Sequence, residues 1–210
     1  MAFIRTTSPT ASTTAAGNER NQDRDISGLL RQLTDPDAAV RRWAARDLLP
    51  FAEATEALVE RLQGEHDVSV REIILTTLTR QGGAVAVAGL VGCLRSEDAM
   101  LRNEAIEAMK VLPAEMAPIM GALLHDADSD VRIMAVNILE SLQHPMVEQW
   151  LIEVIDHDSV VNVCGTAVDL LGELGSPQAQ GALQRLKSRF ADEPYIQFAA
   201  NLALKRIAKA

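Results

Sequence analysis

Three histidines of this chain are each followed by an aspartate, a combination that can bind a metal ion or move a proton. The pairs are His66-Asp67, His125-Asp126 and His157-Asp158. His66 and His157 recur in equivalent turns three repeating units apart, which separates them by roughly 30 Å at about 8–10 Å per packed helix layer. We therefore expect these histidines to be exposed turn residues, and we expect no metal site.

The two cysteines, Cys93 and Cys164, are the other candidates for chemistry. Neither has a CxxC partner, and both stand among apolar residues that suit small buried side chains. A cysteine nucleophile needs a nearby histidine in an electropositive site. The sequence also has no GxSxG, P-loop or GxGxxG motif. We expect no catalytic residue, no cofactor and no enzymatic activity, and the unpaired cysteines favour a reducing, cytoplasmic location.

The turns that carry these histidines belong to a repeating unit. Each copy contains an apolar anchor residue, and the anchors follow one another at intervals of 30, 31, 30, 30 and 35 residues. They are Val40, Val70, Leu101, Val131, Val161 and Ile196. Apolar or small residues return three, four and eight places after each anchor, as in Val131, Met134, Ala135 and Leu139. This spacing predicts an amphipathic helix in the second half of every unit.

Polar residues predict where these helices begin. Five places before the anchor stand mostly residues that cap helix N-termini, namely Asp35, Glu65, Ser96, Asp126 and Asp156. Pro36 then falls at the expected first helical position. Three places before the anchor every copy has an acid, which the helix dipole favours in a first turn. Proline or glycine ends each helix, and a shorter apolar pattern predicts another helix before the next unit.

Each unit is therefore expected to be a helical hairpin that buries its apolar faces only against its neighbours. We predict an all-α protein, a right-handed α-solenoid of about six hairpins and twelve helices. Residues 1–24 are poor in large apolar side chains and are expected to be a disordered tail. The repeat domain is expected over 25–210, with repeats at about 25–52, 53–83, 84–113, 114–145, 146–176 and 177–210.

The segments "DPDAAVRRWAARDLL" and "DADSDVRIMAVNILESL" resemble the D-P-x-x-x-V-R-x-x-A-x-x-x-L signature of HEAT repeats. The period of about 30 residues resembles the short, phycobilisome-lyase-like class of that family. The resemblance implies that the second helix of each pair lines a concave face. It also implies a ladder of charged residues between neighbouring repeats, here Asp35, Arg41, Arg71, Arg102, Asp126, Arg132 and Asp156. Deoxyhypusine hydroxylase, a HEAT-like enzyme, uses His-Glu dipeptides for a di-iron site, and this chain has none.

Residues two and six places after the anchors lie off the buried stripe and are the predicted partner-binding positions on the concave face. We name Arg42, Arg46, Glu72, Asn103, Glu107, Ile133, Asn137, Val163 and Phe198. The series runs from charged to apolar along the chain. The apolar members Ile133, Val163 and Phe198 form either an exposed patch for a partner segment or part of the packed core, and the sequence leaves both open.

Charge and hydropathy limit the partners. The chain has a net charge of -9, so a nucleic-acid-binding face is not expected, and no run of 18 apolar residues suggests a membrane span. We expect a partner protein of unknown identity. The function expected first is that of a non-enzymatic scaffold or adaptor in bacterial signalling or complex assembly. The alternative is a chromophore- or cofactor-attachment factor resembling phycobilisome lyase subunits.

Overall fold

The computed structural model describes residues 24–209. This part of the chain consists of helices and turns without a β-strand, which confirms the expected all-α class. The α-helices of the described residues are Ile26–Gln32 (α1), Ala38–Asp47 (α2), Thr55–Gly64 (α3), Val68–Gln81 (α4), Gly83–Cys93 (α5), Ala99–Lys110 (α6), Pro113–Leu124 (α7), Ser129–Leu139 (α8), Val147–His157 (α9), Val161–Leu174 (α10), Gln180–Arg189 (α11) and Pro194–Ile207 (α12). Single 3₁₀ turns, Ala52–Ala54 (η1) and Pro177–Ala179 (η2), precede α3 and α11.

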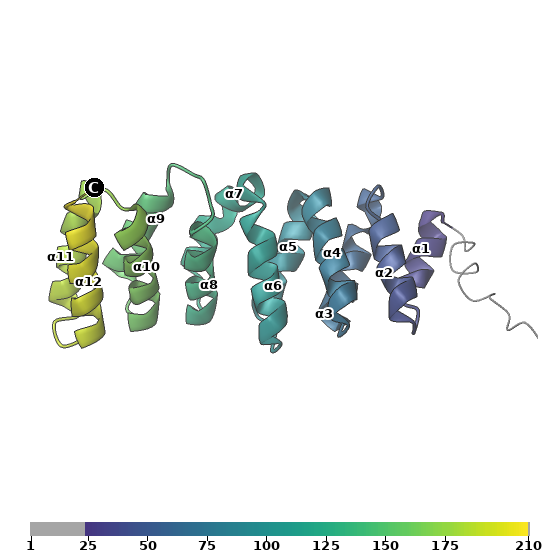
Figure 1. Cartoon of the computed structure of the whole chain (residues 1–210), viewed down its shortest axis with the longest axis horizontal. Coiled ribbons are helices and arrows are strands. Elements are labelled where there is room, and N and C mark those ends of the chain that lie inside the picture. Colours follow the sequence, from purple (N-terminus) through teal and green to yellow (C-terminus); the bar gives the residue numbers. More distant parts are fainter. Residues whose placement is uncertain (1–23, 210) are drawn as a thin grey trace, which may run out of the picture.

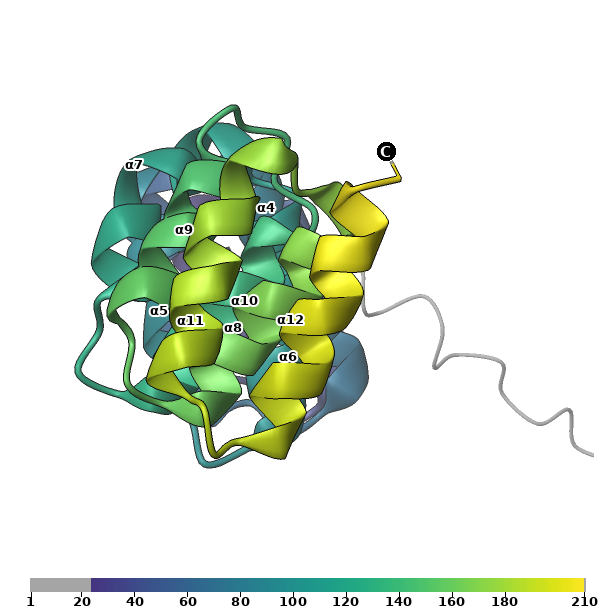
Figure 2. The ribbon, with the colours of Figure 1, turned by 90° about the vertical axis from the view of Figure 1, so that its left-hand side faces the viewer.

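The helices form two layers that run the length of the molecule. Each odd-numbered helix contacts the even-numbered helix that follows it, and α2, α4, α6, α8, α10 and α12 contact one another in that order. Figure 1 shows the hairpins side by side from α1 to α12, and Figure 2 shows the odd and even layers from the α11–α12 end. The expected α-solenoid is confirmed.

The expected tail, residues 1–24, lies outside the described residues except for Arg24. The guanidinium group of Arg24 forms an ion pair with Asp47 of α2 at 2.6 Å. The six repeat ranges expected from the sequence stay predictions, and the helix bounds given above are what the structure adds to them.

Four of the even-numbered helices, α2, α4, α6 and α8, begin two residues later than expected. Their N-caps are the acids three places before the anchor, Asp37, Asp67, Asp98 and Asp128, whose carboxylates accept backbone N–H groups of the first turn. The expected caps accept instead from the backbone N–H of the true cap, as Asp35 does from Asp37 at 2.8 Å. They close a turn before the helix, and Pro36 lies in that turn. The expected cap positions were therefore wrong by two residues.

Glycine is required at the junction between α4 and α5. Gly82 and Gly83 have φ angles of 63° and 80°, in the left-handed region that side chains with a Cβ disfavour. The backbone N–H of Gly82 still bonds to the carbonyl of Leu78 at 2.8 Å. The glycine pair therefore ends α4 and starts α5 without an intervening loop.

The core is a continuous apolar layer between the odd and even helices. Its large fully buried side chains are mostly leucine, isoleucine and methionine, and they occur along the whole stack, from Leu29 in α1 to Ile196 in α12. Leu58, Ile74 and Leu90 are fully buried at 0 % exposure and belong to three consecutive helices. Because each layer covers the apolar side of the other, no hairpin has to bury its helices alone.

Helices α3 and α5 approach one another closely at Gly89. A Cβ built on Gly89 would lie 2.4 Å from Cγ2 of Val59, far closer than carbon atoms pack. Gly92 of the same helix has its nearest such neighbour, Nε2 of Gln63, at 3.7 Å. The missing side chain of Gly89 therefore sets the distance between these two neighbouring helices of the odd layer.

Replacing Gly89 with alanine is expected to destabilise the protein by about 1–3 kcal/mol, the usual cost of overpacking. Gly92→Ala is the matched control and should stabilise it by up to about 1 kcal/mol, because alanine favours the helix. Urea unfolding measures both free energies, and Val59→Ala should recover part of the loss in the Gly89→Ala protein. Equal stability of the two alanine variants would contradict the close approach.

Candidate functional site

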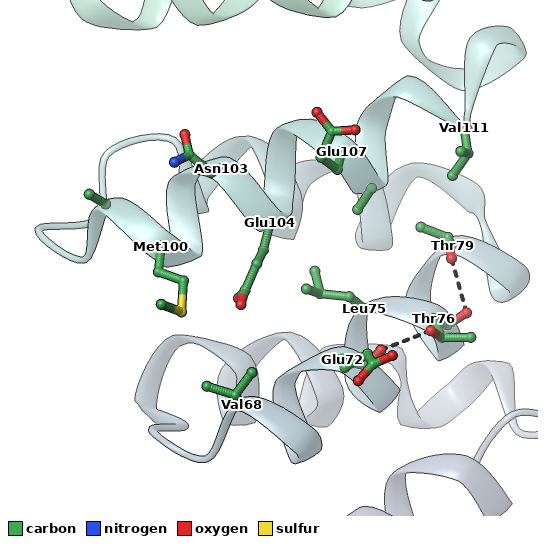
Figure 3. Close-up of a pocket in the computed structure, with 12 residues that line it drawn as sticks. Val68, Glu72, Leu75, Thr76, Thr79, Met100, Asn103, Glu104, Glu107 and Val111 are labelled. Atoms are coloured by element: carbon green, nitrogen blue, oxygen red, sulfur yellow. Dashed lines mark hydrogen bonds between the residues drawn. The ribbon is translucent and has the colours of Figure 1, made fainter.

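A groove opens between α4 and α6 on the outer surface of the even-numbered helices, which we call the even-helix face. Its volume is about 730 Å³. Side chains of both helices line it, namely Val68, Glu72, Leu75, Thr76 and Thr79 of α4, and Ala99, Met100, Asn103, Glu104, Glu107, Ala108 and Val111 of α6 and its C-cap. In Figure 3, Met100 and Glu104 point from α6 toward α4. We refer to this site as the α4–α6 groove.

Helical spacing places these residues along the groove. On α4, Glu72, Thr76 and Thr79 are spaced three or four residues apart, which places them on one side of the helix. On α6, Met100, Glu104 and Glu107 have the same spacing. Thr76 donates its hydroxyl to the carbonyl of Glu72 at 2.8 Å, and Thr79 donates to that of Thr76 at 3.0 Å (Figure 3). Both hydroxyls are thereby held against their own helix.

The α4–α6 groove is apolar at its ends and acidic between them. Val68 and Met100 are 53 % and 52 % exposed near the helix N-termini, and Val111 is 66 % exposed near the C-terminus of α6. Its charged lining residues are all carboxylates, those of Glu72, Glu104 and Glu107. Such a surface favours a ligand that has both apolar and cationic groups.

An arginine lies beneath the groove. The side chain of Arg71 is 4 % exposed, and its Nη1 donates to Oδ2 of Asp98 at 2.5 Å. Its Nε lies 3.3 Å from Oε2 of Glu104, but the two atoms are not aligned for a hydrogen bond, and both are buried without a hydrogen-bond partner. Burial raises the pKa of Glu104, an effect that Arg71 opposes, whereas the hydrogen bond from Arg71 lowers the pKa of Asp98.

Arginines that follow the anchors join three pairs of neighbouring repeats. Arg41 donates to both carboxylate oxygens of Glu65 at 2.7 and 2.8 Å. Arg132 donates to both oxygens of Asp158 at 2.6 and 3.1 Å, and Arg71 reaches Asp98 as described. Arg102 bonds instead to carbonyls of its own repeat, those of Ser96 and Glu97. The role of these residues in holding the repeats together stays a prediction.

The acids expected in the ladder have other partners. The carboxylate of Asp35 accepts the backbone N–H of Asp37, and Asp126 pairs with Arg95 of the preceding repeat. Asp156 pairs with Arg185 of the following repeat at 2.7 Å. The arginines of α4 and α8 reach the acid three places before the next anchor, which is the N-cap of α6 in the case of Asp98 and lies just before α10 in the case of Asp158.

The structure separates the predicted partner-binding residues by exposure. Exposed members are Arg46, Glu72, Asn103, Glu107 and Phe198, and half-buried members are Arg42, Ile133 and Asn137. Glu72, Asn103 and Glu107 line the α4–α6 groove. Phe198 lies far along the chain, on the terminal helix α12, and is 68 % exposed. Their role in binding a partner stays a prediction.

For Val163, the prediction of a partner-binding surface residue was wrong. It is completely buried, so it cannot contact a partner on the surface. Helix α10 packs against both α9 and α12, and Gly165 allows this approach, because a Cβ there would lie 2.3 Å from the ring of Tyr195. The packing of α10 against α8, α9 and α12 thus goes with a core position where the earlier repeats have a surface position.

Several lining residues were not anticipated. The exposure of Val68, Met100 and Val111 has no signal in the periodic pattern, because apolar residues near helix ends are common in cores as well. Glu104 did have a signal. It stands three places after its anchor, Leu101, where the pattern of the other repeats has an apolar residue of the buried stripe. A carboxylate at such a position indicates a polar site.

A second group of cations lies at the N-terminal end of the even-helix face. The guanidinium carbon of Arg46 lies 4.4 Å from the ring centroid of Trp43, and that of Arg42 lies 6.0 Å from it. Arg46 is exposed, and Trp43 is half-buried. Two arginines over one indole offer an anion both positive charge and a flat surface.

Two of the His-Asp pairs do come together. His125, Asp126, His157 and Asp158 line a common hollow of about 230 Å³ with Arg132. The acids are held by Arg95 and Arg132, and Nδ1 of each histidine lies within 3 Å of a carbonyl of its own helix. Among residues 24–209, no group of three or more metal-binding side chains is arranged to hold an ion.

The two thiols are poor nucleophiles. Both cysteines are buried, and burial raises the pKa of Cys93 to about 11. Burial also raises the pKa of Cys164, although the guanidinium group of Arg189 lies 3.6 Å from its Sγ and opposes this effect. Both remain protonated at neutral pH.

Over the described residues, no helix has the length and hydropathy needed to cross a membrane.

Comparison with known proteins gives a family and a relative. The model of HEAT repeats matches residues 26–110 and 117–205. The bilin biosynthesis protein PecE of Mastigocladus laminosus is 30% identical over 152 residues, which cover 70% of this chain and 56% of that protein. The chain thus spans about half the length of this curated relative.

Among solved structures, the TOG3 domain of Drosophila melanogaster Mini spindles is similar with a TM-score of 0.55 and 14% identity, over 86% of this chain and 93% of that one. This likeness concerns the fold. The complex of CpcE and CpcF of phycocyanin lyase from Nostoc sp. PCC7120 matches 94% of this chain and 100% of that chain at 19% identity and a TM-score of 0.38. At that score the likeness to the complex supports no conclusion about this chain.

The bond between Arg41 and Glu65 predicts a pH dependence of stability. Burial alone would raise the pKa of Glu65, but hydrogen bonds from Arg41, from the backbone of Asp67 and from Arg61 outweigh it and lower the pKa to about 2. A carboxylate with a lowered pKa stabilises the fold above its unfolded pKa of about 4.5, and this contribution disappears as the pH falls toward 2.

Glu65→Gln is therefore expected to lower the free energy of unfolding at pH 7 by on the order of 3 kcal/mol. The difference from wild type should shrink as the pH falls below about 4.5, because the wild-type carboxylate then takes up its proton. Glu56→Gln, at an exposed position of α3, is the control and should change little at any pH. A constant difference across the pH range would show that Glu65 acts through packing alone.

Proposed function

This chain belongs to the HEAT-repeat family, and from that premise we propose that it is an α-solenoid subunit in the attachment of bilin chromophores to a phycobiliprotein. The observation that carries the proposal is the 30% identity to the bilin biosynthesis protein PecE over 152 residues. The matched length exceeds four of the repeat intervals counted in the sequence, so it involves several hairpins rather than one shared motif.

This similarity corrects two expectations drawn from the sequence. The chain was expected first to be a non-enzymatic scaffold or adaptor, with a role in signalling or assembly. That expectation and the expectation that it takes no part in an enzymatic activity were wrong, because the relative is a bilin biosynthesis protein. The chromophore-attachment alternative, which the sequence left in second place, is the one that the relative supports.

The chemistry of the described residues supports a role in binding and orienting rather than in covalent catalysis by this chain. The two thiols are buried and protonated, and the hollow with two histidines has its acids engaged by arginines. In the proposed function, the even-helix face would hold the bilin or the acceptor protein so that the reacting groups meet, which by itself accelerates a bimolecular step.

A bilin is an open-chain tetrapyrrole with carboxylate side chains and a flat conjugated system. Arg42 and Arg46, beside the indole of Trp43, provide charge for such carboxylates and a surface for the conjugated part. The acidic α4–α6 groove would repel the same carboxylates. We therefore assign the bilin to the α2 end of the even-helix face within this proposal.

The proposed partners are an acceptor phycobiliprotein or a second lyase subunit, and the cytoplasmic location expected from the sequence is kept as part of the proposal. Binding of nucleic acid is not part of the proposal, since the chain has a net charge of -9.

The proposal predicts bilin transfer in a defined mixture. The purified chain is incubated with free bilin and an apo-phycobiliprotein, with and without a second lyase subunit. Visible absorbance and the fluorescence of bilin that stays on the denatured acceptor measure attachment. We expect the chain to increase the yield of bound bilin, and no increase in any mixture would contradict the proposal.

The contact assigned to arginine is tested by titrating the purified chain with free bilin and following the visible absorbance. Arg46→Glu should weaken binding of free bilin by about tenfold, because removing a charge-assisted contact and adding a repulsive one costs at least about 1.4 kcal/mol. Arg80→Glu makes the same change of charge at an exposed position near the C-terminus of α4 and is the control. If both variants bind bilin like the wild type, the bilin lies elsewhere.

A further inference from the structure

The last hairpin of the chain is basic, in contrast to the rest. Residues 180–210 contain six lysines and arginines and two acids, a net charge of +4. Residues 25–179 contain eleven lysines and arginines and twenty-five acids, a net charge of -14. Opposite charges therefore gather at different places along one solenoid. Two copies of such a chain attract each other when the basic end of one meets the acidic body of the other.

Helix α12 presents an exposed stripe of apolar and cationic side chains. Phe198 is 68 % exposed and Leu202 is 39 % exposed, and they stand one turn apart. Lys205, three residues further, continues the same side of the helix and is exposed, as is the adjacent Arg206. From Pro194 onward the sequence has no acid. The stripe is thus apolar in its first half and cationic in its second half.

The α4–α6 groove complements this stripe. It has exposed Val68 and Met100 at the N-terminal ends of its helices, and its charged lining residues are carboxylates. The nearby cation Lys110 already pairs with Glu107 at 3.1 Å and with Glu140 at 3.3 Å, and its side chain is 16 % exposed. The groove therefore offers apolar contacts at Val68 and Met100, and the carboxylates of Glu72, Glu104 and Glu107 give it net negative charge between this end and Val111 at the other end.

The two surfaces also agree in direction and length. The even-numbered helices are the second helices of successive hairpins, so they run in the same sense along the stack (Figure 1). A two-fold axis parallel to them keeps that direction and reverses the order of the repeats. Phe198 of one copy then faces Met100 of the other, and Lys205, about 10 Å further along its helix, faces the side of Glu107.

We infer that the chain forms a two-fold dimer in which α12 of each copy lies in the α4–α6 groove of the other. The axis passes between α8 and α10, close to α8, because the midpoint between the groove and α12 lies there in the stack. Each copy contributes one groove and one helix, so the contact is self-complementary and closes as a pair. This inference does not depend on the proposed function, and the α2 end of the even-helix face stays outside the paired helices.

The first test measures the mass of the full chain in solution by sedimentation equilibrium. We expect a species of twice the 22.8 kDa chain that dissociates as salt is added, because the contact is partly electrostatic. Phe198→Asp should weaken the dimer at least about tenfold. Val85→Asp, which changes an exposed apolar residue of α5 on the odd layer, should leave it intact. A wild-type chain that stays monomeric overturns the inference, and so does a dimer that Phe198→Asp leaves unchanged.

A charge exchange tests the same contact without touching apolar residues. Lys205→Glu/Lys209→Glu in one chain and Glu72→Lys/Glu107→Lys in another change exposed positions only. Each variant alone should be monomeric, and an equimolar mixture should associate, since both groove contacts of the mixed dimer pair opposite charges, one in the native and one in the exchanged arrangement. Circular dichroism checks that both variants keep their helix content. If the mixture stays monomeric while the wild type is dimeric, the dimer uses another surface and the inference fails.

Discussion

The helices have to bury apolar side chains against both their own hairpin partner and the neighbouring hairpins, and the rest of the structure depends on this burial. Leu58, Ile74 and Leu90 come from three consecutive helices and are all fully buried. A hairpin alone would leave one of these faces in water, at a cost of about 1.5–3 kcal/mol for each large side chain. Stacking is therefore the condition for folding, and it also produces a long surface whose composition the core does not constrain.

Stacking creates a second demand at every junction, because it brings arginine side chains out of water. Arg41 finds Glu65, and Arg132 finds Asp158, each through two hydrogen bonds. At the junction of α4 and α6, Arg71 bonds to Asp98 but leaves its Nε unpaired beside Glu104. A buried guanidinium with an incomplete set of bonds costs free energy. The α4–α6 groove thus lies above the junction whose polar groups are least well satisfied among these three.

The surface that results has distinct chemical regions along one face. Cations surround Trp43 at the α2 end, carboxylates line the α4–α6 groove, and the stripe of Phe198 and Lys205 ends the stack. None of these regions combines an activated nucleophile with a base. Such a face is consistent with a subunit that binds and orients bilin or protein partners. Because the regions are separate, one solenoid can contact more than one partner at once.

Local physics determined much of this protein from the sequence. A period of about 30 residues and the 3.6-residue spacing within each unit predicted the hairpins and the solenoid, because burial of a helical stripe leaves a periodic trace. The same spacing placed Glu72, Asn103 and Glu107 on one surface. The tertiary structure alone decided where neighbouring helices approach: Val163 is buried in α10, which packs against α8, α9 and α12, and Gly165 of the same helix admits the ring of Tyr195. The helix starts lay two residues beyond the expected caps, because Asp35 and its counterparts bond to the next acid rather than to the helix. The approach of neighbouring helices depends on side chains from other repeats, which the local pattern of one repeat does not contain.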